Sequence, residues 1–192
     1  MSDRRKYELK KRAERLEETR RRITEATVEL HRTVGPAATR ISEVAKRAGV
    51  QRATVYNHFP DDATLFAACS AHWRALHPAP DPARWAEIPD AQERLRVALR
   101  DLYAWFRETE PMTANVLRDA QLLPALRQIV EGGMGAYTAN VNRLLAEPFG
   151  GGRRVEAAVR AVTGFEFWRA LAPLGDDAAD LAARLVEAAA AG

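Results

Sequence analysis

The residues from Gln51 to Phe59 combine side-chain types that suit contact with a nucleic acid. The run QRATVYNHF presents one guanidinium, two amides, two hydroxyls and one imidazole, and no acidic residue interrupts it. Guanidinium and amide groups bond to base edges, and hydroxyls and ring nitrogens also reach phosphate oxygens. We therefore expect DNA contacts from the polar members of the run, which are Gln51, Arg52, Thr54, Tyr56, Asn57 and His58.

The preceding residues predict a short helix that ends in a tight turn. Four apolar residues recur there at helical spacing, namely Ile41, Val44, Ala45 and Ala48. Gly49 follows them, and glycine adopts the left-handed conformation of a helix C-terminus at little cost. A second helix is expected from about Gln51 to His58, with Val55 facing inward.

Ala45 and Gly49 indicate how these two helices are joined. A small residue, then glycine four places on, then an apolar residue six places later, is typical of a helix-turn-helix. In that motif the second helix enters the major groove of DNA. The alternative is an amphipathic helical hairpin inside an all-α core. A preceding helix, predicted from about Thr19 to Val34, would cover the apolar side of the pair and complete a three-helix unit.

Charge is distributed unevenly along the chain. Residues 1–60 contain 15 Lys and Arg against 8 Asp and Glu, whereas residues 61–192 contain 14 against 18. This division favours a polyanion-binding domain at residues 1–60 and a domain with a different role at residues 61–192. Residues 1–22 hold ten basic and five acidic residues, which suits either a phosphate-binding arm or a solvated tail.

The remainder of the chain predicts further helices. Apolar residues recur at helical spacing over 62–76, 90–110, 111–119, 124–147, 153–172 and 176–191. No stretch alternates convincingly with period two, so we expect an all-α fold of about nine helices. Gly132, Gly133 and Gly135 predict a kink in their helix, or a close approach by another backbone or a ligand.

Several large side chains in these helices are candidates for the wall of a ligand cavity, namely Trp105, Met112, Tyr137, Asn140, Phe165 and Trp168. The alternative is that they form an ordinary apolar core. A cavity with this lining predicts an apolar or aromatic ligand. The last two predicted helices are rich in small residues, which suits either closure of the monomer's core or a four-helix bundle between two copies.

Enzymatic, metal-binding and membrane functions are disfavoured. The sequence has no HExxH, GxSxG or CxxC pattern and no phosphate loop, so we expect no catalytic residue, metal ligand or cofactor. His72 and His77 are five residues apart and do not share a helical face. A single cysteine, a charged N-terminus and the lack of a long apolar segment predict a cytoplasmic chain without a membrane span.

The stretch ATRISEVAKRAGVQRATVYNHFPDDATLF resembles the signature of the TetR-type bacterial transcriptional regulators. The resemblance implies a homodimer in which the first three helices bind a palindromic operator, helices four to seven frame a ligand pocket, and the last two helices dimerise. By motif position, it implies base contacts for Arg52 and Ala53 and phosphate contacts for Thr54, Tyr56, Asn57 and His58. Ser42, on the preceding helix, takes a position that often reads a base.

Two positions depart from the family pattern. Asp62 stands where a lysine that contacts phosphate is common. Arg40 occupies the place of a usual Ser or Thr cap, exchanging that cap for a positive charge that we include among the DNA contacts.

These observations predict a repressor that binds double-stranded operator DNA as a homodimer and is released by a small apolar or aromatic effector. The alternative is an architectural or partner-regulated DNA-binding protein with no small-molecule inducer. The two differ in whether the C-terminal part holds a ligand cavity.

Overall fold

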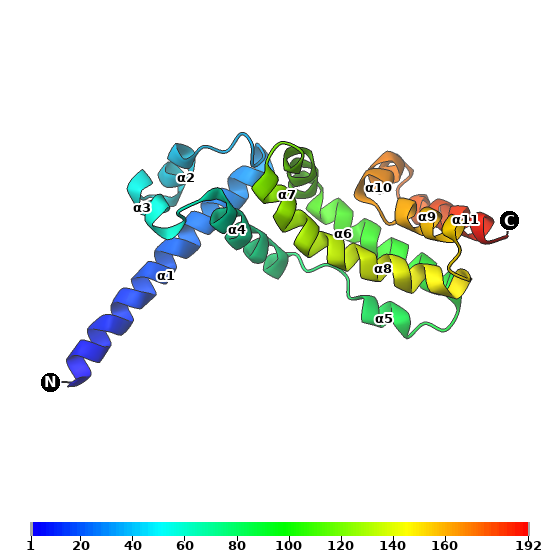
Figure 1. Cartoon of the computed structure of the whole chain (residues 1–192), viewed down its shortest axis with the longest axis horizontal. Helices are drawn as coiled ribbons and strands as arrows, with labels where there is room; N and C mark the ends of the chain where they lie inside the picture. The colour runs from blue at the N-terminus through cyan, green and yellow to red at the C-terminus, as the bar shows by residue number, and fades with distance from the viewer. Residues whose placement is uncertain (1, 192) are drawn as a thin grey trace. The chain divides into compact units, whose positions relative to one another are not determined.

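The computed structural model describes residues 2–191, with side chains described from residue 6 onward. Every regular element in that range is helical, which confirms the predicted all-α fold class (Figure 1). The helices form two compact units. The N-terminal unit holds the residues up to His77 together with Pro111–Val130, and the C-terminal unit holds Pro78–Glu110 together with the residues from Glu131.

The N-terminal unit is built from α1 (Ser2–Thr33), α2 (Ile41–Ala48), α3 (Arg52–His58), α4 (Asp62–Leu76), α7 (Pro124–Val130) and the end of α6. Helix α1 packs on both α2 and α4, and α4 packs on α7. Residue 60 was predicted to divide two functional domains, and that division stays a prediction. By packing, α4 belongs with the helices that precede it.

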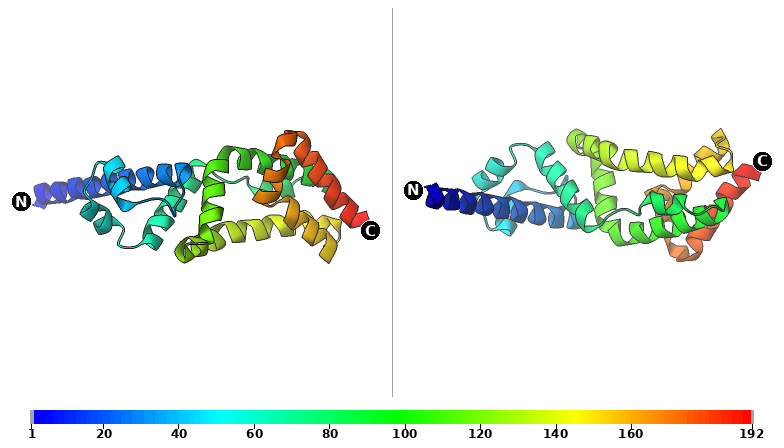
Figure 2. Two further views of the ribbon diagram at one scale, coloured as in Figure 1. Left: turned by 90° about the horizontal axis from the view of Figure 1, so that it is seen from above. Right: turned by 90° about the horizontal axis from the view of Figure 1, so that it is seen from below.

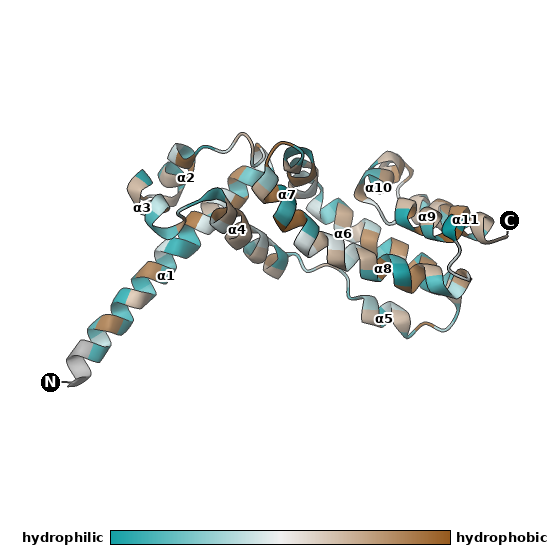
Figure 3. Ribbon diagram, viewed as in Figure 1, coloured by the Kyte–Doolittle hydropathy of each residue, from teal (hydrophilic) through white to brown (hydrophobic). Residues whose placement is uncertain are grey.

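Helix α1 begins well before the helix predicted from Thr19. No glycine or proline interrupts residues 2–18, and pairs one turn apart, such as Lys10 with Glu14 at 3.9 Å, favour continuation of the helix. Both views in Figure 2 show α1 as one straight helix that runs past α2, α3 and α4. We call residues 2–18 of α1 the arm. Figure 3 shows it as largely hydrophilic, with isolated hydrophobic residues.

The expected helix over 62–76 is confirmed as α4. Its N-cap is Asp61, whose carboxylate accepts a hydrogen bond from the main-chain N–H of Thr64 at 2.7 Å. An N-cap carboxylate satisfies a donor that the first turn of a helix otherwise leaves unpaired, and it complements the helix dipole. The acidic pair after Pro60 therefore has a structural role.

Helix α6 (Ala91–Ala120) corrects the prediction that Pro111 begins a separate helix. Proline costs one intrahelical hydrogen bond, here the one to the carbonyl of Arg107, but its φ is compatible with a helix. Both Arg107 and Pro111 are exposed, so that carbonyl lies on a side of the helix accessible to water. The flanking side chains of Phe106 and Met112 are buried, each in the core of its own unit, which offsets the lost bond.

The C-terminal unit combines most of α6 with α5 (Pro82–Ala86), η1 (Glu131–Gly135), α8 (Ala136–Ala146), η2 (Glu147–Phe149), α9 (Arg153–Val162), α10 (Phe165–Leu171), η3 (Ala172–Leu174) and α11 (Asp177–Ala191). Helix α9 packs on α8 and α11. Element η1 is a π-helical turn that contains all three glycines of the segment predicted to be irregular. Such turns are rare and occur mostly within longer helices.

The helix predicted over 153–172 is divided in the structure into α9 and α10, so its continuity was wrongly predicted. Gly164 is the N-cap of α10, with φ −80° and ψ 142°, and a Cβ there would lie 3.2 Å from the carbonyl oxygen of Ala161. The carbonyl of Val162, at the end of α9, accepts a hydrogen bond from the Tyr103 hydroxyl at 2.9 Å. This tertiary donor stabilises the break in place of a continued helix.

Two further observations concern the described part of the chain. None of its helices is both long and apolar enough to cross a lipid bilayer. Within the same residues, no three His, Cys, Asp or Glu side chains are grouped so that they could hold a metal ion.

Candidate nucleic-acid interface

Helices α2 and α3 form a helix-turn-helix with the predicted turn. Gly49 has φ 66° and ψ 39°, which is the left-handed conformation expected at this position. The N–H of Val50 donates to the carbonyl of Ala45 at 3.0 Å, which closes the turn. Arg40 precedes α2 with an extended backbone and makes no side-chain cap, in agreement with the departure noted in the sequence.

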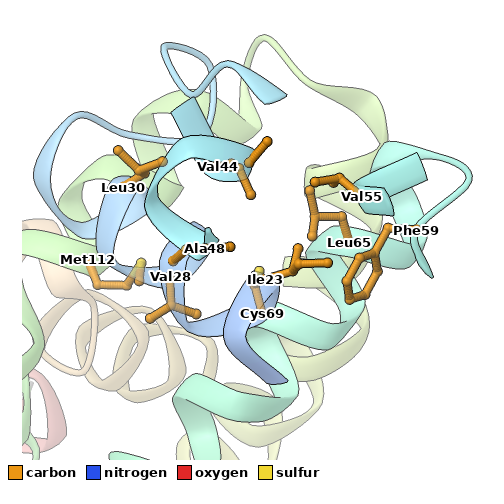
Figure 4. Packing of buried hydrophobic residues seen from close by; sticks show 12 residues of the cluster. Ile23, Val28, Leu30, Val44, Ala48, Val55, Phe59, Leu65, Cys69 and Met112 are labelled. Carbon is orange, nitrogen blue, oxygen red and sulfur yellow. The ribbon is translucent and has the colours of Figure 1, made fainter. Parts of the chain in front are cut away.

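One apolar core fixes the orientation of both helices. Ala45 and Ala48 of α2 and Val55 of α3 are buried with Ile23 of α1 and Leu65 of α4 (Figure 4). Ala45 is 3% exposed, so a larger side chain there would force the helices apart. Burial of Val55 turns the opposite side of α3 toward solvent.

Cys69 of α4 belongs to the same core. Burial raises the pKa of its thiol to about 12, so it stays protonated and packs as a small apolar side chain.

The solvent-facing side of α3 carries the predicted DNA contacts. Within the described residues, no hydrogen bond or ion pair occupies the side chains of Arg52, Tyr56 or Asn57, and all three are exposed. The structure brings together on α2, the turn and α3 the full predicted set, all exposed or half-buried: Arg40, Ser42, Gln51, Arg52, Ala53, Thr54, Tyr56, Asn57 and His58. This surface can donate to and accept from a polar partner without first breaking internal bonds.

Two arginines of α1 hold the helix-turn-helix in place, and the sequence gave no specific indication of them. Arg20 donates to the carbonyl oxygen of His58 at 2.8 Å and lies 4.2 Å from the centroid of the Phe59 ring. Arg22 donates to the carbonyl oxygen of Ala48. Each guanidinium thus bonds to a carbonyl at a helix C-terminus, where positive charge is favourable.

A polar cluster fixes the link between α1 and α2. Asn115 donates to the carbonyl of His31 at 3.0 Å, and Asp119 accepts from the N–H of Ala37 at 2.9 Å and from Arg118 at 2.7 Å. Burial lowers the pKa of His31 to about 4, although the charge of Asp119 opposes the shift. The pKa of Asp119 is itself lowered, because its bonds to Arg118 and Ala37 outweigh the effect of burial.

The second predicted site is only partly brought together. Trp105 and Tyr137 have ring centroids 6.4 Å apart, and Phe165 and Trp168 have centroids 5.3 Å apart. Phe106 connects these pairs, at 5.4 Å from Trp105 and 5.5 Å from Phe165. These residues all lie in the C-terminal unit.

The two remaining members of the predicted cavity wall lie apart from this aromatic group. Met112 is buried in the core of the N-terminal unit. Asn140 is exposed and accepts a hydrogen bond from Arg143 at 3.0 Å. The proposed lining therefore stays a prediction, for which the aromatic group is the part assembled in one place.

Two hollows of about 540 and 440 Å³ occur in the C-terminal unit. The first includes Arg143, Glu147 and Arg160 in its wall, and the second includes Arg107 and Asp176. Neither is lined by any of the six residues predicted for the ligand cavity. Both have charged walls, unlike the apolar lining that the sequence predicted.

Comparison with known proteins agrees with this arrangement. Residues 23–69 match the family model described as bacterial regulatory proteins of the tetR family. The matched segment begins at the buried Ile23 of α1 and ends at the buried Cys69 of α4, so it spans the helix-turn-helix and its support. None of the curated proteins matches the chain in sequence.

Solved structures share the fold over nearly the whole chain. A protein assigned to the TetR-family transcriptional regulators, from Mesorhizobium loti, is 20% identical with a TM-score of 0.64, covering 92% of this chain and 97% of its own. A TetR-like transcriptional regulator from a Rhodococcus species is 19% identical, with a TM-score of 0.63 and coverage of 91% and 96%. The fatty acid degradation regulator FadR from Bacillus halodurans is 16% identical, with a TM-score of 0.58 and coverage of 91% and 95%.

Proposed function

We propose that this chain, which carries a TetR-family helix-turn-helix segment within a TetR-type fold, is a homodimeric transcriptional repressor that a small ligand releases from its operator. The observation that carries the proposal is the exposed, unoccupied polar face of α3, held by a buried three-helix core. A face of this kind is expected where side chains must exchange water for base edges and phosphates.

In the proposed complex, α3 is the recognition helix and lies in the major groove. Arg52 at its first turn suits the O6 and N7 acceptors of guanine, and Ala53 beside it suits a thymine methyl group. Thr54, Tyr56 and His58 supply donors for the phosphates. Asp62, which cannot contact phosphate favourably, lies in the first turn of α4 after its Asp61 cap.

Dimerisation is proposed through the outward faces of α9 and α11. Each of these helices buries one side, with Val159 of α9 and Val186 of α11 fully covered. The opposite side of α9 presents Ala157 and Ala161 to solvent, and that of α11 presents Leu185. Small and apolar residues at one-turn spacing allow close helix packing, which supports a two-fold four-helix bundle.

Ligand release is proposed to involve the aromatic group around Phe106. Its members supply an apolar lining, and the π-helical turn η1 is a place where the backbone can rearrange with little loss of side-chain packing. A ligand releases the protein from DNA only if it binds the DNA-incompetent state more tightly. Because one structural neighbour is a fatty acid degradation regulator, acyl compounds belong among the ligands to screen.

The test begins with selection of bound sites from random duplexes by the full-length protein. We expect a palindromic consensus, and we expect Arg52→Ala to lose about 1–3 kcal/mol of preference for it while retaining the fold. Arg74→Ala removes an exposed arginine from α4 and serves as the matched control. An unchanged site preference in Arg52→Ala would contradict the proposed role of α3.

Release is then tested with the selected duplex carrying a fluorescent label. Apolar, acyl and aromatic compounds are added, and a fall in anisotropy reports dissociation. If site-specific binding is present and no compound class releases the DNA, the alternative of an architectural or partner-regulated DNA-binding protein is supported instead.

A further inference from the structure

The arm is a helical extension that packs on no other element of its unit. Its side chains from Lys6 to Glu18 are all exposed. Figure 1 shows the arm continuing the axis of α1 beyond α3. At a rise of about 1.5 Å per residue, the 17 residues of the arm extend about 25 Å.

The charges of the arm are segregated around the helix. Successive residues of an α-helix are turned by about 100°. Five residues fall within about 60° of one line along the helix, namely Lys6, Leu9, Arg12, Ala13 and Leu16. The four glutamates from residue 8 to residue 18 all lie outside that sector, so this face, which we call the acid-free face, carries basic and apolar residues alone.

The acid-free face lies on the side of α1 that holds α3. The same line continues through Arg20 and Ile23. Arg20 donates to the carbonyl of His58 at the end of α3, and Ile23 is buried in the core with Val55 of α3. A duplex engaged by α3 would therefore present its flanking phosphates toward the acid-free face rather than toward the glutamates.

We propose that the acid-free face binds the sugar–phosphate backbone of duplex DNA outside the half-site contacted by α3. Lys6 and Arg12 supply the phosphate contacts, while Leu9 and Leu16 between them can lie against sugar rings and thymine methyl groups. The inference rests on the proposed function and adds a surface, a partner chemistry and an extent to it. The arm spans about seven base pairs at 3.4 Å each.

Two double variants of the full-length protein test the inference. K6Q/R12Q removes two charges from the acid-free face, and K11Q/R15Q removes two charges from the face that also holds Glu8 and Glu18. Both variants change net charge equally, and all four positions are exposed, so folding is not at issue. Affinity for the selected duplex is measured against salt concentration.

We expect K6Q/R12Q to reduce the slope of log affinity against log salt by about 1.8, at about 0.9 for each lost phosphate contact, and K11Q/R15Q to leave it unchanged. For the wild-type protein, removing seven base pairs of flanking DNA on each side should reproduce the lower slope. Equal effects of the two variants, or no effect of either, would overturn the inference while site-specific binding persists. Absence of site-specific binding in the wild-type protein would instead contradict the proposed function.

L9Q/L16Q separates DNA binding from contact between copies. Sedimentation of this variant should give the same mass as the wild-type protein. A lower mass would show that the acid-free face joins two chains, and the inference would then be wrong.

Discussion

Arg20 and His58 are joined by a hydrogen bond of 2.8 Å from the guanidinium of α1 to the main-chain oxygen at the end of α3. The same guanidinium lies 4.2 Å from the centroid of the Phe59 ring. Because α3 has seven residues, only about two turns, its position depends on tertiary contacts more than on helix propensity. Arg20 therefore acts as a positioning residue for the polar face of α3.

Arg20→Ala should lower the free energy of unfolding by about 1–3 kcal/mol, since it removes a charge-assisted bond and the contact with Phe59. Arg20→Lys should retain part of this. Arg21→Ala is the control, because its ion pairs with Glu18 and Glu25 are on the surface and contribute at most about 0.5 kcal/mol each. Urea unfolding followed by circular dichroism makes the comparison. Equal losses in Arg20→Ala and Arg21→Ala would show that the bond to His58 has no special weight.

Gly49 and Gly132 should respond in opposite directions to alanine. Gly49 has φ +66°, and a Cβ there would lie 2.7 Å from Arg22 Nη2, so Gly49→Ala should destabilise the protein by about 1–2 kcal/mol. Gly132 has no heavy atom within 4 Å of its Cβ position and no positive φ, so Gly132→Ala should stabilise by up to about 1 kcal/mol. Thermal unfolding gives the sign of each change. A stable Gly49→Ala protein would contradict the left-handed turn.

Stability should fall as the pH drops from about 6.5 to about 4, because burial lowers the pKa of His31 from 6.5 to about 4. Between these values the unfolded chain binds more protons than the native one, so protonation favours unfolding. We expect His31 to account for a loss of about 2 kcal/mol between pH 7.5 and pH 5.0. Urea titrations at the two pH values, on the wild-type protein and on His31→Leu, measure it. The variant has no group to protonate at this site, so an identical pH dependence would contradict the assignment.

The DNA-binding unit could be predicted because its determinants are local. The spacing of Ala45, Gly49 and Val55 specifies helix lengths, a left-handed residue and a buried side, all within one short segment. The same local logic gave α4 its correct bounds from the Asp61 cap. The exposure of the α3 face followed from this geometry.

The errors arose where tertiary contacts override local preferences. Pro111 is a helix breaker in isolation, yet α6 continues through it because buried side chains on both sides favour the helix. The break at Gly164 depends on the Tyr103 hydroxyl, which is 59 positions away from its acceptor in sequence. Met112 likewise has a type that suits a cavity wall, but its partners in the N-terminal core are distant in sequence. Arg20 and Arg22 were missed because an arginine on a charged helix has no local pattern that names its partner.

Leu185 gives a direct test of the proposed dimer. It is 46% exposed on the side of α11 opposite the buried Val186, so nothing in one chain accounts for an apolar residue there. Leu185→Glu would place a carboxylate in an apolar two-fold interface and its symmetry mate nearby, and burial of an unpaired charge is costly. We expect light scattering after gel filtration to give the mass of a monomer, with circular dichroism unchanged.

Leu122→Glu is the matched control for this change, because Leu122 is 70% exposed and lies in the N-terminal unit. It should leave the dimer mass unaltered. The monomeric variant should also lose affinity for a palindromic duplex while binding a single half-site as the wild-type protein does, since two linked half-sites give affinity that one cannot. A dimer that survives Leu185→Glu would place the interface elsewhere on the chain and remove α11 from it.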